Sequence, residues 1–128
     1  CIMNAAVADF TPKVVSDRKM KKRDQNLLIE LKPTVDILQT LGAQKQHDQI
    51  LVGFALETND GEHYAIDKLQ RKNLDLIVLN TLADAGAGFK TETNKVTMID
   101  KNLQKTETKL KSKAEIATDI CQKIIQLL

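Results

Sequence analysis

The sequence predicts an α/β fold, in which a largely parallel sheet carries helices on its faces and one long polar flap leaves it. Short apolar runs of strand length recur along the 128 residues, and amphipathic segments of helical length follow several of them. One lysine-rich stretch interrupts this alternation and has almost no apolar periodicity. The resulting order is strand, loop, strand, helix, strand, helix, strand, strand, helix.

The first predicted strand covers residues 1–8, which form a continuous apolar run. Such a run is typical of a parallel strand that is covered on both faces. A central strand needs a neighbour on each side, and this one starts at residue 1 without a cap or turn before it. We therefore expect the chain to be the later part of a larger domain.

A flap, a short strand and a helix follow. Residues 11–26 are polar and lysine-rich, so they predict a long loop or flap. Residues 27–31 predict an apolar strand, which Pro33 ends because proline restricts the residue before it. The next helix is expected over residues 35–44, with Thr34 as its N-cap. Its predicted inward-facing residues are Ile37, Leu38 and Leu41.

The middle of the chain predicts a strand, a helix and a second strand. Residues 50–55 and 74–79 are the apolar strands, and residues 62–72 form a helix of roughly three turns between them. The second strand ends at Asn80, and the glycine-containing residues 83–88 predict a loop.

The last part of the chain contains the clearest local signal. Residues 95–100 alternate as a strand, whereas residues 102–109 fit either an edge strand or a polar connection. Ser112 and Glu115 have the spacing of a capping box, which predicts the start of a helix. One face of that helix carries Ile116, Ile120, Ile124 and Leu127.

Composition limits the classes of function. With 42% apolar and 28% charged residues the chain fits one compact soluble domain, and its formal charge of +2 gives no support for nucleic-acid or membrane binding. Cys1 and Cys121 have no CxxC spacing and no clustered histidine, so we expect no metal site and a reduced, cytoplasmic setting. No apolar run approaches the roughly 20 residues that a membrane span needs.

The fold class indicates where a ligand would bind. In open α/β sheets, ligands lie beyond the carboxyl ends of the strands, where strand order reverses. This rule selects residues 4–10, the flap after them, residues 54–59 and Asn80 onwards. Neither glycine-rich phosphate motif, GxxxxGK[ST] or GxGxxG, occurs in the chain, which weakens a dinucleotide oxidoreductase reading.

The first of these places combines small residues with one carboxylate. Ala5, Ala6 and Ala8 would let a flat base or a phosphate approach the backbone, although tight packing of a helix on the sheet explains alanine runs in most α/β proteins. Asp9 could accept a hydrogen bond from a ribose hydroxyl or a base amino group, or it could cap the following turn. Both readings stay open for both features.

The flap carries five cations within six positions. A mobile cationic loop suits a reaction that builds negative charge on a phosphate, because it can close over the substrate. The same run would also serve as an ordinary solvated loop that maintains solubility. The five cations are Arg18, Lys19, Lys21, Lys22 and Arg23.

Three further residues have two readings each. Phe54, at a strand end, could be core or could contact a nucleobase face. Lys68 and Lys72 lie one helical turn apart, so their ammonium groups repel unless an anion compensates them. Asp67 and Asp75 could supply that compensation, and so could a triphosphate.

Five ordered motifs with their spacing resemble the bacterial phosphopantothenate-cysteine ligase family, often the C-terminal part of a bifunctional protein with a flavin-dependent decarboxylase. The resemblance runs from residue 1 to the last helix. The motifs are Asn4–Phe10 (NAAVADF), Lys19–Lys22 (KMKK), Lys32–Leu38 (KPTVDIL), Val52–Thr58 (VGFALET) and Lys68–Val78 (KLQRKNLDLIV).

The resemblance implies a Rossmann-like sheet and a ligase reaction in coenzyme A synthesis. CTP with Mg²⁺ would activate the carboxylate of 4'-phosphopantothenate as an acyl-cytidylate with release of pyrophosphate, and the cysteine amine would displace CMP. By resemblance, Lys19 is the flap lysine that serves formation of the acyl-cytidylate. The implied nucleotide contacts are Met3, Asn4, Ala5, Asp9, Lys19, Val35, Asp36, Ile37, Leu38, Phe54, Lys68 and Lys72.

The resemblance also sets expectations about partners and about what is missing. It implies a homodimer, and FMN only where a decarboxylase domain precedes this segment. The family's earlier half, with a glycine- and serine-containing loop and an asparagine used in the second half-reaction, has no counterpart here, so this segment alone should lack a complete active site. Asn4 stands where many relatives have a small apolar residue. The alternative function is a non-catalytic nucleotide-binding or regulatory module of the same fold.

Overall fold

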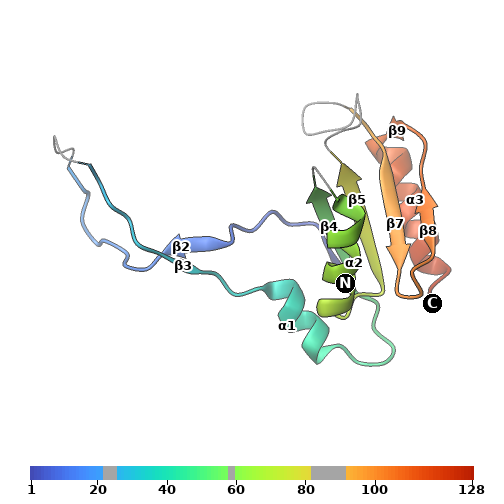
Figure 1. Cartoon of the computed structure of the whole chain (residues 1–128), viewed down its shortest axis with the longest axis horizontal. Helices are drawn as coiled ribbons and strands as arrows, with labels where there is room; N and C mark the ends of the chain where they lie inside the picture. The colour runs from blue at the N-terminus through green and yellow to red at the C-terminus, as the bar shows by residue number, and fades with distance from the viewer. Residues whose placement is uncertain (22–25, 58–59, 82–91) are drawn as a thin grey trace. The chain divides into compact units, whose positions relative to one another are not determined.

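The computed structural model describes residues 1–21, 26–57, 60–81 and 92–128 (Figure 1). The chain divides into two compact units, and each is described by itself. Unit 1 comprises Cys1–Asn4 and Ile37–Leu128, and unit 2 comprises Ala5–Asp36. The loop predicted at residues 83–88 lies outside the described residues.

Unit 1 is built on a five-stranded sheet with the order β1-β4-β5-β7-β8. The pairs β1·β4 and β4·β5 are parallel, whereas β5·β7 and β7·β8 are antiparallel. Only β7 therefore opposes the other four strands of this sheet, which confirms the largely parallel prediction. The strands are β1 (Ile2–Met3), β4 (Val52–Glu57), β5 (Leu76–Thr81), β7 (Val96–Asp100) and β8 (Lys105–Glu107).

The helices of unit 1 cover both faces of this sheet (Figure 1). The helices α1 (Ile37–Gln44) and α2 (Gly61–Arg71) bury Leu38 and Leu69 against Ile77 and Leu79 of β5. Alternate residues of β5 face the other way, because successive side chains of a strand point to opposite faces. There Leu76 and Val78 pack with the buried residues of α3 (Lys113–Ile125), which are Ile116 and Ile120.

The capping box predicted at the start of the last helix is confirmed. The Ser112 hydroxyl accepts a hydrogen bond from the Glu115 N–H, and the Glu115 carboxylate accepts one from the Ser112 N–H. The pKa of Glu115 is lowered, first by the hydrogen bond from the Ser112 side chain and then by that from its backbone. A small antiparallel pair, β6 (Thr93–Asn94) with β9 (Lys111–Ser112), leads into this helix.

Unit 2 is an antiparallel ribbon of β2 (Phe10–Pro12) and β3 (Leu31–Pro33). Two hydrogen bonds continue the pairing past its base: the Thr34 N–H donates to the Asp9 carbonyl at 2.9 Å, and the Thr34 hydroxyl donates to the Ala8 carbonyl at 2.7 Å. The predicted flap at 11–26 therefore begins within a strand, and part of it, residues 22–25, lies outside the described residues.

Three predicted boundaries near the N-terminus are wrong. The strand predicted over 1–8 is paired only at Ile2–Met3, because the chain then leaves the sheet to form the ribbon. The strand predicted over 27–31 is instead Leu31–Pro33; the missing N–H of Pro33 is tolerated because both strands of a two-stranded ribbon are edges. The first helix begins at Ile37, so Thr34 is not its N-cap.

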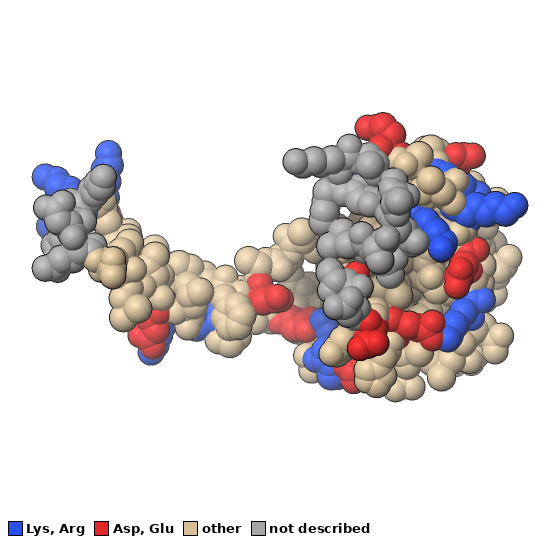
Figure 2. Space-filling view, turned by 45° about the horizontal axis from the view of Figure 1, so that its top comes forward, with Lys and Arg blue, Asp and Glu red and all other residues tan. Residues whose placement is uncertain are grey.

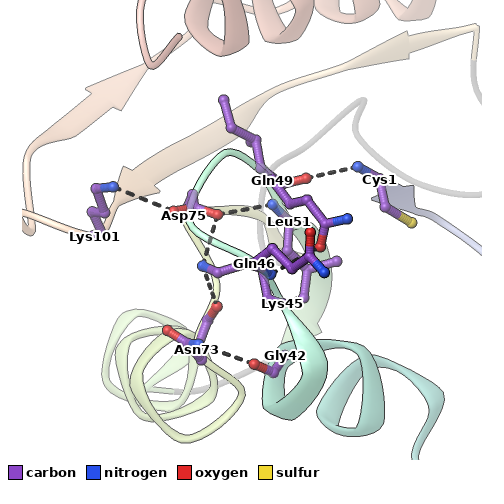
Figure 3. Close-up of polar contacts among 10 residues, drawn as sticks. Cys1, Gly42, Lys45, Gln46, Gln49, Leu51, Asn73, Asp75 and Lys101 are labelled. Atoms are coloured by element: carbon purple, nitrogen blue, oxygen red, sulfur yellow. Dashed lines mark hydrogen bonds and ion pairs between the residues drawn. The ribbon is translucent and has the colours of Figure 1, made fainter.

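A buried carboxylate just before β5 connects the start of β4 with the ends of α1 and β7 (Figure 3). Asp75 Oδ2 accepts from the Leu51 N–H at 2.8 Å and from Lys45 Nζ at 2.9 Å, and Asp75 Oδ1 accepts from Lys101 Nζ at 3.4 Å. Lys45 also donates to the Asn73 carbonyl at 2.8 Å. Burial alone would raise the pKa of Asp75, but these donors outweigh it and the pKa lies below its usual value.

This lowered pKa predicts how stability depends on pH. The contribution of Asp75 is fully present above its unfolded pKa, roughly 3.9, and is lost as the pH falls through the lower folded pKa. We expect Asp75→Asn to lower the free energy of unfolding by about 2 kcal/mol at pH 7 and to flatten its decline below about pH 4. Urea unfolding between pH 2 and 7 measures both effects. If the free energy of unfolding of the variant fell below pH 4 as steeply as that of the unaltered protein, Asp75 would not be the source of this pH dependence.

Candidate nucleotide site

The strands β1, β4 and β5 run in the same direction; β4 and β5 end at the same edge of the sheet, whereas β1 ends earlier, opposite the second residue of β4. Met3 ends β1 and pairs with Gly53 of β4, and Asn4 follows it. Phe54 is the next residue of β4, and Asn80 lies near the end of β5 opposite Leu56. Phe54 is therefore inside β4 and not at its end as predicted, and Asn80 lies two residues farther along the sheet than the Phe54–Val78 pair.

Gly53 allows α1 to pack closely on the first half of β4. A Cβ atom at Gly53 would lie 2.8 Å from both Leu38 Cδ2 and Leu74 Cδ1, which is closer than real Cβ atoms approach. The absent side chain thus makes room for Leu38, which is buried, whereas its neighbour Ile37 is exposed. Two of the predicted nucleotide residues, Ile37 and Leu38, consequently begin a helix that rests on the strand carrying Phe54.

Lys68 of α2 connects to the same strand. Its Nζ donates to the Phe54 carbonyl at 3.0 Å, so the ammonium group lies against the backbone of β4. Phe54 itself is partly buried and packs on the α3 side of the sheet. Lys72 follows α2 as its C-cap, and its backbone carbonyl lies beside Gly42 of α1. The structure thus brings Met3, Leu38 and Lys68 to the backbone of Gly53 and Phe54, whereas the Phe54 side chain lies on the other face of the sheet.

Asp67 and Asp75, which the sequence suggested as partners for these lysines, form ion pairs with other residues. Asp67 pairs with Arg71 at 3.5 Å, and Asp75 pairs with Lys45 and Lys101. Positive and negative side chains are interspersed on the face of unit 1 that Figure 2 shows.

Unit 2 holds the other predicted contacts. The two Thr34 bonds place Ala8 and Asp9 beside the chain that leads to Val35 and Asp36. Ala5, Asp9, Val35 and Asp36 are all exposed. Within this unit the structure brings Asp9 together with the start of the Val35–Leu38 motif, two segments about 25 positions apart in the sequence.

Lys19 lies on the outgoing limb of the ribbon, between β2 and residues 22–25. It is exposed, and so are Arg18 and Lys21 beside it. Figure 2 shows cations at the tip of unit 2. Lower on the same limb, Lys13 Nζ forms an ion pair with Glu30 at 2.6 Å. Lys22 and Arg23, which complete the predicted cluster, lie outside the described residues.

Asn80 is a residue whose local environment the sequence did not show. Among the described residues, its Oδ1 is the buried side-chain atom without a hydrogen-bond partner. The sequence selected its position at a strand end but gave no signal of an unpartnered amide. Within the same part of the chain, no group of three or more His, Cys, Asp or Glu side chains is placed to hold a metal ion. No helix there is long and apolar enough to cross a membrane.

Comparison with known families decides the relationship. The family model described as "DNA/pantothenate metabolism flavoprotein C-terminal domain" matches residues 1–128. The chain belongs to this family. The membership confirms the resemblance noted from the sequence motifs, and it covers both the sheet of unit 1 and the ribbon of unit 2.

Individual relatives agree with this membership. The chain is 55% identical over 126 residues to the coenzyme A biosynthesis bifunctional protein CoaBC of Bacillus subtilis (strain 168), covering 98% of the chain and 31% of that protein. It is 53% identical over 127 residues to a protein named cysteine/cysteine sulfinic acid decarboxylase from an unknown prokaryotic organism, covering 99% of the chain and 35% of that protein. The chain therefore spans about a third of the length of these relatives.

A solved structure confirms the fold class. The crystal structure of the C-terminal domain of coenzyme A biosynthesis bifunctional protein CoaBC matches with a TM-score of 0.76 and 40% sequence identity. The match covers 98% of this chain and 53% of that one. The Rossmann-like, largely parallel sheet predicted from the sequence is thus the fold of this family.

Proposed function

We propose that the full-length protein containing this chain joins cysteine to 4'-phosphopantothenate in coenzyme A biosynthesis. CTP would activate the carboxylate as an acyl-cytidylate, pyrophosphate would leave, and the cysteine amine would then displace CMP. The observation that carries the proposal is the match along the whole chain to proteins named for coenzyme A biosynthesis. The structure also brings Met3, Leu38 and Lys68, three residues that the family resemblance assigns to the nucleotide, to the backbone of Gly53 and Phe54 in β4, which supports the proposal.

The proposed roles come from the family resemblance, and the charges of the residues agree with them. Negative charge grows on the α-phosphate when the carboxylate attacks it, and preorganised cations there lower the barrier. Lys19 is the proposed catalytic cation, and Lys68 and Lys72 are proposed contacts of the nucleotide. Met3, Asn4, Ala5, Asp9 and the Val35–Leu38 segment would complete the nucleotide site. The second half-reaction would need residues outside this chain.

Magnesium and FMN enter the proposal differently. Mg²⁺ would accompany CTP, because it keeps several waters and is bound mainly through phosphates and one or two carboxylates. Asp9 and Asp36 are exposed carboxylates of unit 2 that could approach it. FMN belongs to the proposal only for a protein in which a decarboxylase domain accompanies this segment. A homodimer in the cytoplasm is the proposed state.

The full-length product of the gene that encodes this chain tests the proposal. Incubation with CTP, Mg²⁺, 4'-phosphopantothenate and cysteine should release pyrophosphate and form the amide, detected by mass spectrometry. Omission of cysteine should still permit formation of the acyl-cytidylate. Binding of CTP without either product would favour the non-catalytic module, and neither binding nor turnover would refute the nucleotide site altogether.

A further inference from the structure

β8 is the last strand at one side of the five-stranded sheet, next to β7 (Figure 1). The Thr108 N–H donates to the Val96 carbonyl at 3.0 Å, so the backbone of Thr108 is directed at β7. In an antiparallel pair every second residue is directed at the same neighbour. The N–H and C=O groups of Lys105 and Glu107 therefore point away from β7, and no strand of the described residues pairs with this outer side.

A groove of about 490 Å³ opens beside this edge, between β8 and α3. On the sheet side it is lined by Met98 of β7 and by Thr106, the residue of β8 that pairs with Met98. The helix contributes one polar flank, whose residues lie three or four positions apart: Asp119, Gln122, Lys123 and Gln126. A strand added outside β8 would direct every second side chain towards this groove.

The end of the chain that forms this edge is positively charged. Residues 101–128 contain six lysines and three acidic residues, so their formal charge of +3 exceeds the +2 of the whole chain. Two of the lysines at the groove are neutralised within the fold, since Lys111 pairs with Asp119 at 2.7 Å and Lys123 pairs with Asp100 at 3.1 Å. The third, Lys109, is exposed and forms no ion pair within the described residues.

The charges at this edge can select a partner strand. Lysines on an edge strand usually prevent pairing with other strands. Lys105, however, forms an ion pair with Glu62 of α2, and its register partner Ile99 lies in the core beneath α1 and α2, on the face away from the groove. The free ammonium group at the groove is that of Lys109, which attracts an acidic segment and repels a basic one.

We propose that the outer side of β8, together with the groove along α3, binds an extended acidic segment of a partner protein as a further strand of the sheet. In such strand addition, backbone hydrogen bonds supply affinity and pockets for alternate side chains supply specificity. Lys105 and Glu107 offer the backbone groups, and Lys109 attracts a carboxylate. A nucleic acid also carries negative charge, but it has no peptide backbone to pair with β8. The proposal is independent of the ligase function.

The probe is a fluorescent eight-residue peptide of alternating glutamate and threonine, titrated with the full-length protein and followed by fluorescence anisotropy. We expect this peptide to bind, and to bind more weakly as the salt concentration rises. A peptide of alternating lysine and threonine should not bind. The acidic peptide with N-methylated backbone amides should also fail to bind, because it keeps its charge and loses the hydrogen bonds to β8.

Lys109→Glu tests the selecting charge. We expect it to weaken binding of the acidic peptide by at least about fivefold, because attraction of a carboxylate becomes repulsion. Lys113→Glu is the matched control. Lys113 is also exposed and forms no ion pair within the described part of the chain, but it does not line the groove, so this variant should bind normally.

Glu107→Pro tests the backbone pairing. It removes one outward N–H and leaves the bonds of β8 to β7 in place, and proline is tolerated on an edge strand. We expect binding to weaken by about fivefold relative to Glu107→Ala, which makes the same change of charge and keeps the N–H. If Glu107→Pro does not fold, Lys109→Glu and the N-methylated peptide still decide the question.

Three results would overturn the proposal. The acidic peptide could fail to bind the unaltered protein. The N-methylated peptide or a single-stranded oligonucleotide could bind as well as the acidic peptide, which would leave only a surface that attracts any polyanion. Lys109→Glu and Lys113→Glu could lose affinity equally, which would exclude the groove as the site. The variants should release pyrophosphate at the normal rate, so the peptide titration and the ligase assay fail or succeed separately.

Discussion

Replacing Lys19 by glutamine is expected to lower the rate of pyrophosphate release by about 10²–10³-fold, the loss typical of one preorganised group that stabilises developing charge. Glutamine keeps much of the length of the side chain and removes only its charge. Lys19 is exposed on the outgoing limb of the ribbon, so the substitution should leave the fold intact. Single-turnover assays that follow the acyl-cytidylate measure this step directly.

The chain offers a matched control for Lys19. Lys13→Gln makes the same change of charge on the same limb, but its ammonium group is paired with Glu30 at 2.6 Å. We expect that variant to turn over at nearly the normal rate, because exposed ion pairs contribute little. Lys19→Arg should recover part of the activity. Normal turnover by Lys19→Gln would remove Lys19 from the mechanism, and equal losses in both variants would indicate a general effect of ribbon charge.

Replacing Gly42 by alanine is expected to destabilise the protein by about 3 kcal/mol, the upper end of typical overpacking costs. A Cβ atom at this position would lie 1.9 Å from the carbonyl oxygen of Lys72, and a backbone atom cannot rotate away. Helix propensity alone predicts the opposite change in stability, because it favours alanine over glycine by roughly 1 kcal/mol within a helix. Urea unfolding measures the difference.

Gln44→Ala is the control for that experiment, because Gln44 is exposed in the same helix. Its effect should remain within about 0.5 kcal/mol. A stability of Gly42→Ala equal to that of the control would show that α1 shifts freely relative to α2. Asn73 gives a reason to expect otherwise, since its Nδ2 donates to the Gly42 carbonyl at 3.0 Å and holds the two helices together.

Features specified by local spacing could be predicted from the sequence. The capping box of Ser112 and Glu115 needs only two residues three positions apart, and the structure contains both hydrogen bonds. The strand at Val96–Asp100 was also predicted from its alternation, whereas for residues 102–109 the sequence left an edge strand and a polar connection open, and the structure shows the strand at Lys105–Glu107. The parallel order followed from strands separated by helices.

Features that depend on distant partners could not be predicted from the sequence. The apolar residues after Met3 look like strand, but their pairing ends where the chain turns towards Thr34, a partner more than 25 positions away. Leu28 is apolar yet 95% exposed, so hydrophobicity alone misplaced the second strand. Likewise the unpartnered oxygen of Asn80 depends on which residues β4 and β7 place beside it.

The two bonds of Thr34 at the base of the ribbon have a consequence for how this segment can vary in length. With β2 and β3 paired and Asp9 and Ala8 tied to Thr34, the ends of the intervening stretch are already held together. The entropy of closing such a loop grows only with the logarithm of its length, by about 0.6 kcal/mol for each doubling. Insertions between the two strands should therefore be thermodynamically inexpensive, whereas loss of the Thr34 hydroxyl would loosen both limbs at once.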